Sequence, residues 1–178
     1  ITGVGGTGVV TVGAVLAMAA HLEGKGAGMM EMAGLAQKGG AVHIHCRFAN
    51  MPEDISAVRV AVGEADSVIG GDLVVTAGAK TLGLMSRDRT KVMCNSHEII
   101  TGEFTKNTEF LFPSDRMQVS LTGRLGEDSV VFLNATELAR VHLGDSIFAN
   151  MLIVGAAWQN GQIPLTSKSI LDAIALNG

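Results

Sequence analysis

The chain opens with ITGVGGTGVVTVGAVLAMAAHL, residues 1–22, and this stretch decides the expected fold. Its first part, Gly3-Val4-Gly5-Gly6-Thr7-Gly8, fits the pattern G-x-G-x-x-G. Residues 9–22 are rich in alanine and leucine and apolar almost all round, which is typical of a helix packed on a sheet. The sequence therefore predicts a glycine-rich turn that leads into a buried helix.

Such a turn can bind an anion. Glycines let the backbone approach a pyrophosphate or a similar group, with the N–H groups and the helix dipole facing it. The leading candidate ligand-facing residues are Gly3, Gly5, Gly6, Thr7 and Gly8. A dinucleotide site also needs an acidic residue roughly 20 residues further on, where Glu23 and Glu31 lie. The alternative is that the glycines serve only a tight turn and close packing of the helix on the sheet.

A second candidate segment is Gln37-Lys38-Gly39-Gly40, which precedes an alternating stretch. A lysine followed by two glycines can place an ammonium group beside exposed backbone N–H groups, which suits a phosphate or a carboxylate. Lys38, Gly39 and Gly40 are therefore further candidate cofactor-binding residues. A solvated lysine at a turn is the alternative.

The remaining chain predicts an α/β fold, a three-layer sandwich with a largely parallel sheet. Unbroken apolar runs indicate buried central strands, and alternating runs indicate strands with one polar face. The expected strands are residues 27–30, 41–48, 58–62, 73–76, 92–94 and 130–133, with 41–48 and 58–62 paired as a hairpin. The expected helices are residues 136–142, 146–159 with a cap at Asp145 or Ser146, and 167–176 behind Thr166. Residues 101–118 show no clear period and are expected to be irregular.

Composition excludes several classes of protein. With 178 residues, 47% hydrophobic and 17% charged, the chain has the size and composition of one globular domain. A net charge of −4, no basic run and few aromatic residues argue against nucleic acid as a partner. The apolar start lacks a positively charged flank and contains several glycines, which argues against a signal peptide or a membrane span. Two cysteines indicate a reducing cytoplasm and exclude a four-cysteine iron–sulfur cluster.

A metal site or a catalytic nucleophile is weakly supported. His43 and His45 share one strand face, and Cys94 and His97 supply further zinc ligand types, but Cys46 points to the opposite face. The sequence has no pair of closely spaced cysteines and no G-x-S-x-G elbow. We assign no catalytic residue and no metal ligand to this chain.

The loop Gly-Leu-Ala-Gln-Lys-Gly-Gly-Ala-Val at residues 34–42 is the most specific of several stretches that carry a family resemblance. Together these stretches resemble the gamma domain of the 2-oxoacid:ferredoxin oxidoreductases, and within them the indolepyruvate enzymes. The others are Gly3–Gly8, Leu22–Lys25, Gly63–Asp66, Gly71–Val74, Asn150, Gly155–Leu165 and Ala173–Gly178. Lys38 stands where many relatives are expected to carry arginine, which keeps the charge but removes bidentate geometry.

The resemblance implies an enzyme that oxidatively decarboxylates a 2-oxoacid, such as indolepyruvate, to an acyl-CoA with ferredoxin as electron acceptor. It implies thiamine diphosphate, Mg²⁺ and iron–sulfur clusters in the parent enzyme, with coenzyme A as co-substrate. This chain lacks a Gly-Asp-Gly thiamine motif and cluster-forming cysteines, so it is expected to hold none of these cofactors alone. Its implied partners are the thiamine-diphosphate and iron–sulfur domains or subunits, on which it packs, and it is implied to help bind coenzyme A.

Residues 1–178 are accordingly expected to form one gamma-type unit of a longer chain or complex, inactive by itself. A whole strand should precede the glycine motif, yet only Ile1 and Thr2 do. Two other functions stay open: a free-standing Rossmann-type NAD(P)-binding oxidoreductase that uses Glu23 or Glu31 on the ribose, and a purely structural interaction module with an apolar docking patch.

Overall fold

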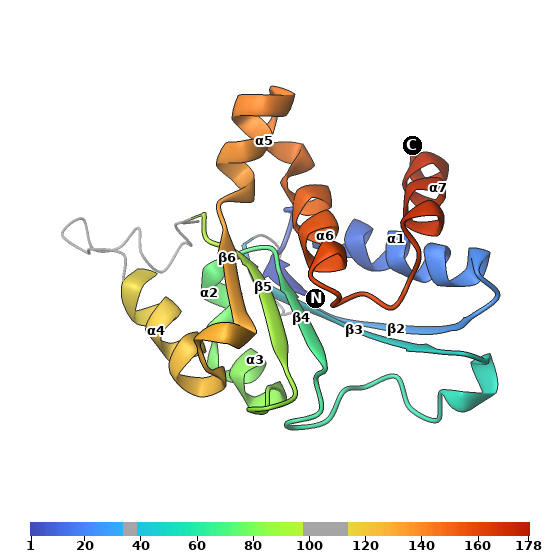
Figure 1. The fold of residues 1–178 in the computed structure, drawn as a ribbon, viewed down its shortest axis with the longest axis horizontal. Coiled ribbons are helices and arrows are strands. Elements are labelled where there is room, and N and C mark those ends of the chain that lie inside the picture. Colours follow the sequence, from blue (N-terminus) through green and yellow to red (C-terminus); the bar gives the residue numbers. More distant parts are fainter. Residues whose placement is uncertain (34–38, 98–113) are drawn as a thin grey trace.

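The computed structural model describes residues 1–33, 39–97 and 114–178, and in them a central sheet lies between two helical layers (Figure 1). The sheet has six strands in the order β2-β3-β1-β4-β5-β6. The strands are β1 (Thr2–Val4), β2 (Gly26–Ala33), β3 (Ala41–Ala49), β4 (Ser67–Gly70), β5 (Lys91–Asn95) and β6 (Val130–Leu133). The three-layer α/β fold predicted from the sequence is confirmed.

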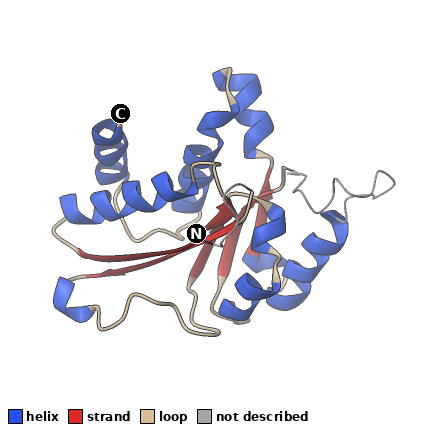
Figure 2. Ribbon diagram, turned by 180° about the vertical axis from the view of Figure 1, so that it is seen from behind, coloured by secondary structure: helices blue, strands red, loops and turns tan. Residues whose placement is uncertain are grey.

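The helices divide between the two faces of the sheet (Figure 2). The helices are α1 (Val9–Leu22), α2 (Leu73–Thr76), α3 (Ala79–Leu84), α4 (Ser114–Leu125), α5 (Ala135–Leu143), α6 (Ala149–Gln159) and α7 (Ser167–Asn177). Short 3₁₀ turns are η1 (Pro52–Asp54), η3 (Glu127–Ser129) and η4 (Ser146–Phe148). Helices α1, α6 and α7 form the layer on one face, and α2, α3 and α4 form the layer on the other. None of the described helices is long and apolar enough to cross a bilayer.

The sheet is largely parallel, as predicted, but its hairpin differs from the expected one. Strands β1, β4, β5 and β6 are parallel, whereas β3 runs antiparallel to both β1 and β2. The predicted pairing of residues 41–48 with 58–62 is wrong: β3 pairs with β2 along Val42–Ala49 and with β1 at Ala41–His43. Residues 58–62 form no strand and pass over one face of the hairpin, where the Val60 N–H donates to His45 Nδ1 at 2.8 Å.

The apolar run at residues 73–76 is helix α2 and not the predicted strand. The strand of this region is β4, and the chain then turns at Gly71. The side chain of Asp72 accepts a hydrogen bond from the Val75 N–H at 2.8 Å and so starts the helix. Leu73 and Thr76 are completely buried, so this single helical turn shows no amphipathic period that sequence reasoning could detect.

Most predicted helices are confirmed. Helix α1 has the predicted bounds, and α7 follows its Thr166 cap as expected. Asp145 caps a 3₁₀ turn, and α6 follows directly, so the expected helix over residues 146–159 is present in two parts. The prediction of irregular structure over residues 101–118 is wrong for 114–118, which begin α4, and its remainder lies outside the described residues.

Candidate functional site

The glycine motif forms the connection between β1 and α1, at the carboxyl edge of the parallel strands. Gly6 and Gly8 have φ angles of +90° and +82°, in the region where a side chain is strained. A Cβ atom on Gly3 would lie 2.3 Å from Val9 Cγ2, so this glycine allows the strand and the helix to pack closely. Gly3 therefore serves the close packing of helix on strand, and Gly6 and Gly8 shape the tight turn; the contact of these residues with an anion stays a prediction.

The N-terminus of α1 has no side-chain cap and no acidic side chain. Gly8 is the N-cap residue and provides no side-chain cap, and the first turn of the helix contains no acidic residue. The first N–H groups of any α-helix lack partners within the helix, and the helix dipole makes this end positive. Gly6, Thr7 and Gly8 are exposed. The Thr7 hydroxyl donates to the Val4 carbonyl at 2.7 Å and so holds the turn closed on the strand.

This turn lies between two neighbouring strands, β1 and β4, that are followed by helices on opposite faces of the sheet. After β1 the chain enters α1 on one face, and after the neighbouring strand β4 it enters α2 on the other face. Open α/β sheets bind ligands in the crevice that such a change creates beyond the carboxyl ends of the strands. The turn is thus placed where the fold itself favours a ligand.

Asp72 and Asn150 are polar side chains that lie beside the glycine motif. Asp72 is completely buried, and burial raises the pKa of its carboxyl group. The side-chain amide of Asn150, in α6, donates to the Thr7 carbonyl, and its nitrogen lies 3.0 Å from where a Gly8 Cβ would be. Motif reasoning assigned neither residue to the site, although both Asp72, within Gly71–Val74, and Asn150 are among the residues that carry the family resemblance.

The two candidate segments meet. The Gly5 N–H donates to the Gly40 carbonyl at 2.7 Å, and Val4 pairs with Ala41 across the sheet. Gly39 is exposed beside the turn, with a φ of +72°. Lys38 lies outside the described residues. The structure therefore brings Gly39 and Gly40 to the glycine motif, and the position of Lys38 stays a prediction.

The histidines considered as zinc ligands are buried strand residues. His43 and His45 lie on one face of β3, as expected, and each is 4% exposed. Burial lowers the pKa of both, that of His43 to about 4. The nearest polar partner of His43 Nε2 is Thr81 Oγ1, at 3.1 Å. No cluster of three or more metal-ligating side chains occurs within residues 1–33, 39–97 and 114–178.

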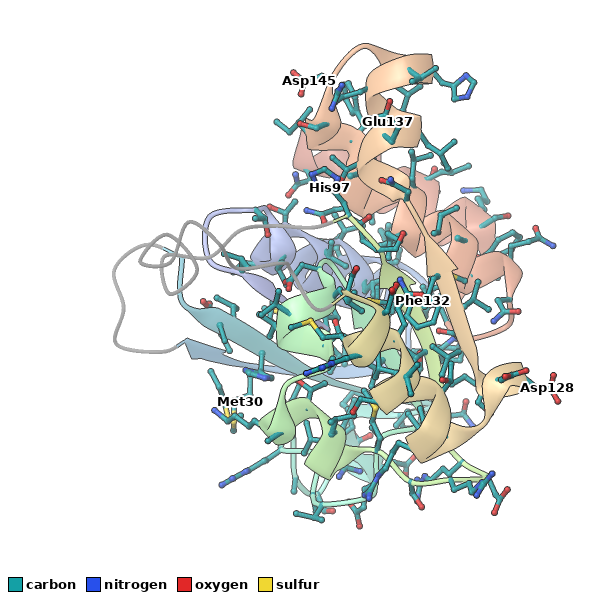
Figure 3. All side chains as sticks on the ribbon, turned by 90° about the vertical axis from the view of Figure 1, so that its left-hand side faces the viewer. Met30, His97, Asp128, Phe132, Glu137 and Asp145 are labelled. Carbon is teal, nitrogen blue, oxygen red and sulfur yellow. The ribbon has the colours of Figure 1, made fainter. Side chains whose placement is uncertain are left out.

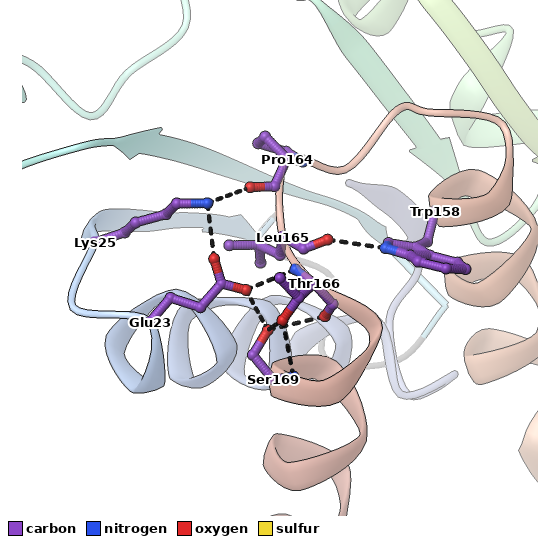
Figure 4. A network of polar contacts seen from close by, with 7 residues as sticks. All are labelled: Glu23, Lys25, Trp158, Pro164, Leu165, Thr166 and Ser169. Carbon is purple, nitrogen blue, oxygen red and sulfur yellow. Dashed lines mark hydrogen bonds and ion pairs between the residues drawn. The ribbon is translucent and has the colours of Figure 1, made fainter.

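The acidic residues considered for a ribose contact lie away from the turn. Glu31 is on β2, and β3 separates β2 from β1, so about 10 Å of sheet lies between the two strands. Glu23 ends α1 and binds other groups: its carboxylate pairs with Lys25 Nζ at 2.7 Å and accepts hydrogen bonds from the Thr166 N–H and the Ser169 hydroxyl (Figure 4). Glu23 therefore ties α1 to the start of α7.

The Glu23 network gives a pH-dependent prediction. These contacts lower the pKa of Glu23 to about 2, first through Lys25 and then through Ser169. The stabilisation is complete above the ordinary pKa near 4.5 and is lost as the pH falls from there towards 2. We expect Glu23→Gln to lower the free energy of unfolding by about 1.5 kcal/mol at pH 7, because hydrogen bonds to a charged group are lost. Urea unfolding of both proteins between pH 7 and pH 3 should show this difference shrinking.

The control for this experiment is Asp172→Asn on α7. Asp172 pairs with Lys168 at 2.6 Å, but both side chains are exposed, so the expected loss is below about 0.5 kcal/mol. A Glu23→Gln difference that stayed constant with pH would contradict the assigned role of the carboxylate.

Comparison with known proteins agrees with this architecture. A protein-family model, pyruvate ferredoxin/flavodoxin oxidoreductase, matches residues 1–177. The chain is 28% identical to the indolepyruvate oxidoreductase subunit IorB of Methanothermobacter thermautotrophicus, over 99% of this chain and 85% of that protein. It is also 28% identical to the subunit of the same name from Archaeoglobus fulgidus, over 98% and 82%.

Two solved structures share the fold. The pyruvate oxidoreductase subunit PORC of Thermotoga maritima superimposes with a TM-score of 0.59 at 18% identity, over 97% of this chain and 86% of that one. The gamma subunit of a keto/oxoacid ferredoxin oxidoreductase from Geobacter sulfurreducens gives 0.57 at 15% identity, over 97% and 81%. Because a family model matches almost every residue, the chain belongs to the pyruvate ferredoxin/flavodoxin oxidoreductase family.

Proposed function

We propose that this chain is the gamma-type component of an oxidoreductase that decarboxylates an arylpyruvate, such as indolepyruvate, to an acyl-CoA and reduces ferredoxin. The names of the similar subunits support the arylpyruvate class. In this reaction the 2-oxoacid loses CO₂, its carbonyl carbon is oxidised, the electrons leave for ferredoxin, and the acyl group passes to the thiol of coenzyme A. Other subunits or domains hold the thiamine diphosphate, Mg²⁺ and iron–sulfur clusters, and the enzyme works in the cytoplasm.

The contribution of this chain is to bind coenzyme A. The observation that carries this proposal is the exposed glycine turn at the uncapped N-terminus of α1, at the carboxyl edge of the sheet where β1 neighbours β4. Coenzyme A carries a pyrophosphate, and backbone N–H groups at a helix N-terminus suit such an anion. Among the described residues, a Cβ atom on Gly6 would meet no atom within 4 Å, which leaves space there for a ligand. Lys38 would add a positive charge beside Gly39 and Gly40.

The experiment is the substitution Gly6→Ala in the complete enzyme. A methyl group at φ +90° strains the turn and occupies the ligand side, so the N–H groups no longer face the anion correctly. We expect the KM for coenzyme A to rise about tenfold, equal to about 1.4 kcal/mol, while the KM for indolepyruvate stays unchanged. Anaerobic viologen reduction with each substrate varied in turn measures both values.

Gly155→Ala is the matched control. Gly155 lies in the helix α6, its φ is not positive, and a Cβ atom there meets nothing within 4 Å. This variant should keep both KM values. An unchanged KM for coenzyme A in Gly6→Ala would contradict the binding role and favour a purely structural module.

The same proposal assigns a docking surface. Helix α5 and the turn η4 project beyond the carboxyl edge of the sheet, and Glu137 and Asp145 mark this end in Figure 3. The charged side chains of this projection include Glu137 and Arg140, which pair at 3.3 Å, and Asp145, which accepts a hydrogen bond from the Ile147 N–H at 2.9 Å. Its exposed apolar residues, hereafter the α5–η4 patch, are Leu138, Val141, Leu143, Ile147 and Phe148. The patch is proposed to pack on the thiamine-diphosphate subunit or domain, because exposed large apolar side chains that gather on one projecting segment suit a protein interface.

A further inference from the structure

Three successive backbone N–H groups at the start of α1 have no partner within the part of the chain that the structure describes. They belong to Gly8, Val9 and Val10. Gly8 has a φ of +82° and a ψ of 13°, which is the left-handed conformation, and Val9 is the first residue of the right-handed helix. Two consecutive residues of opposite hand turn such N–H groups toward one small concavity, which binds anions. The concavity is complete only if the Gly8 N–H points into it.

Gly8 does not fix the direction of its own N–H group. This N–H and the Thr7 carbonyl belong to one planar trans peptide, so the two groups point in opposite directions. Glycine adopts positive and negative φ angles about equally well, so Gly8 also tolerates the same peptide rotated by half a turn. In the rotated peptide the Thr7 carbonyl oxygen replaces the N–H in the concavity. A bound anion would then face an acceptor instead of a donor.

The contact that selects one orientation comes from a distant part of the chain. Asn150 lies in the first turn of α6, and its side-chain amide donates to the Thr7 carbonyl. No other group of residues 1–33, 39–97 and 114–178 donates to this carbonyl. The N–H and the hydroxyl of Thr7 both donate to the Val4 carbonyl, at 3.3 and 2.7 Å, but they do not restrain the peptide that follows Thr7.

Two glycines make room for the Asn150 side chain. A Cβ atom on Gly8 would lie 3.0 Å from Asn150 Nδ2, and a Cβ atom on Gly71 would lie 3.6 Å from Asn150 Oδ1. The amide therefore lies between the turn that follows β1 and the turn that follows β4. Its own helix is firmly placed, because Ile153 and Val154 of α6 are almost completely buried in the core.

We propose that Asn150 is a positioning residue for the anion site: its amide holds the Thr7–Gly8 peptide in the orientation that turns the Gly8 N–H toward a bound phosphate group. This inference rests on the proposed binding of coenzyme A by the glycine turn. Asn150 acts here through the backbone, so it need not touch the ligand. The alternative is a purely structural contact, in which Asn150 only ties α6 to the start of α1.

Two acyl acceptors separate these roles in the complete enzyme. Coenzyme A carries phosphate groups, whereas pantetheine carries the same thiol arm without them. In Asn150→Ala we expect kcat/KM for coenzyme A to fall about tenfold, because an oriented donor to a charged group is lost. The value for pantetheine should not change, because pantetheine presents no anion to the turn. Anaerobic viologen reduction with indolepyruvate, with each acceptor varied in turn, measures both values.

Asn160→Ala is the matched control at the other end of α6. The Asn160 side chain is exposed and makes no hydrogen bond within the described residues, so both values should be retained. Asn150→Asp is a second variant of nearly the same size, in case Asn150→Ala does not assemble. Its ionised carboxylate cannot donate to the Thr7 carbonyl. It should also lower kcat/KM for coenzyme A at least tenfold and leave the value for pantetheine unchanged.

The outcomes distinguish this inference from the proposed function. Equal losses with both acceptors would overturn the positioning role and indicate a loosened fold. An unchanged value for coenzyme A in the Asn150 variants, together with a raised KM in Gly6→Ala, would overturn the positioning role and leave the binding site in place. Unchanged values in all of these variants would overturn both.

Discussion

Replacement of Gly70 by alanine is expected to lower the free energy of unfolding by about 3 kcal/mol, because both overpacking and the loss of buried hydrogen bonds destabilise the fold. A Cβ atom at this position would lie 2.3 Å from Thr76 Oγ1 and 3.1 Å from Cys94 Sγ. Thr76 cannot yield easily, since its hydroxyl is hydrogen-bonded to Thr2 Oγ1 at 2.9 Å and donates to the Asp72 carbonyl. The added methyl group must therefore move β4 away from α2 or break these hydrogen bonds of Thr76.

Urea unfolding followed by the fluorescence of Trp158, the single tryptophan, measures this loss. Trp158 lies in α6, and its indole N–H donates to the Leu165 carbonyl at 2.8 Å, so its environment changes when the fold is lost. Gly123→Ala in α4 is the control, because a Cβ atom there meets nothing within 4 Å. That variant should gain roughly 0.5–1 kcal/mol from the better helix propensity of alanine. Equal stability of both variants would refute the packing argument.

The parts of the fold that depend on local pattern were predictable from the sequence. The apolar residues between the glycine turn and Glu23 predicted α1, and the short apolar run at residues 130–133 predicted β6. The run at residues 73–76 has the same composition as a buried strand, yet the cap by Asp72 and the preceding turn make it helical. A four-residue apolar run contains too few positions for a helical period to distinguish the two.

The candidate site was predictable only in its local part. The glycine spacing predicted the turn, and the order of residues predicted that α1 would follow it. The insertion of β3 between β1 and β2, which separates Glu31 from the turn, depends on pairing over a long sequence distance. The same holds for Asn150, which comes from α6 to bind the Thr7 carbonyl. Such contacts follow from the tertiary fold and leave no signal in nearby residues.

The second large effect is expected for a substitution of Ile147, in the α5–η4 patch. Its effects on stability and on subunit affinity distinguish an interface residue from a core residue. Ile147 is 73% exposed, so Ile147→Ala should change the free energy of unfolding of this chain by less than about 0.5 kcal/mol. If the patch packs on the thiamine-diphosphate subunit, the same substitution removes a buried contact from the centre of that interface. We expect the affinity between the purified subunits to fall about 30-fold, equal to about 2 kcal/mol, in titration calorimetry.

Ile153→Ala gives the comparison that makes this result specific. Ile153 lies six residues further along, in α6, is 1% exposed and packs in the core beneath α1. Removing its buried atoms should cost about 3 kcal/mol in unfolding and leave the affinity of the folded chain for its partner unchanged. Both variants remove the same atoms from an isoleucine. If one loses affinity and the other loses stability, the difference must come from their environments, one exposed and one buried. An unchanged affinity in Ile147→Ala would instead remove the α5–η4 patch from the interface and require another face of the chain to carry the assembly.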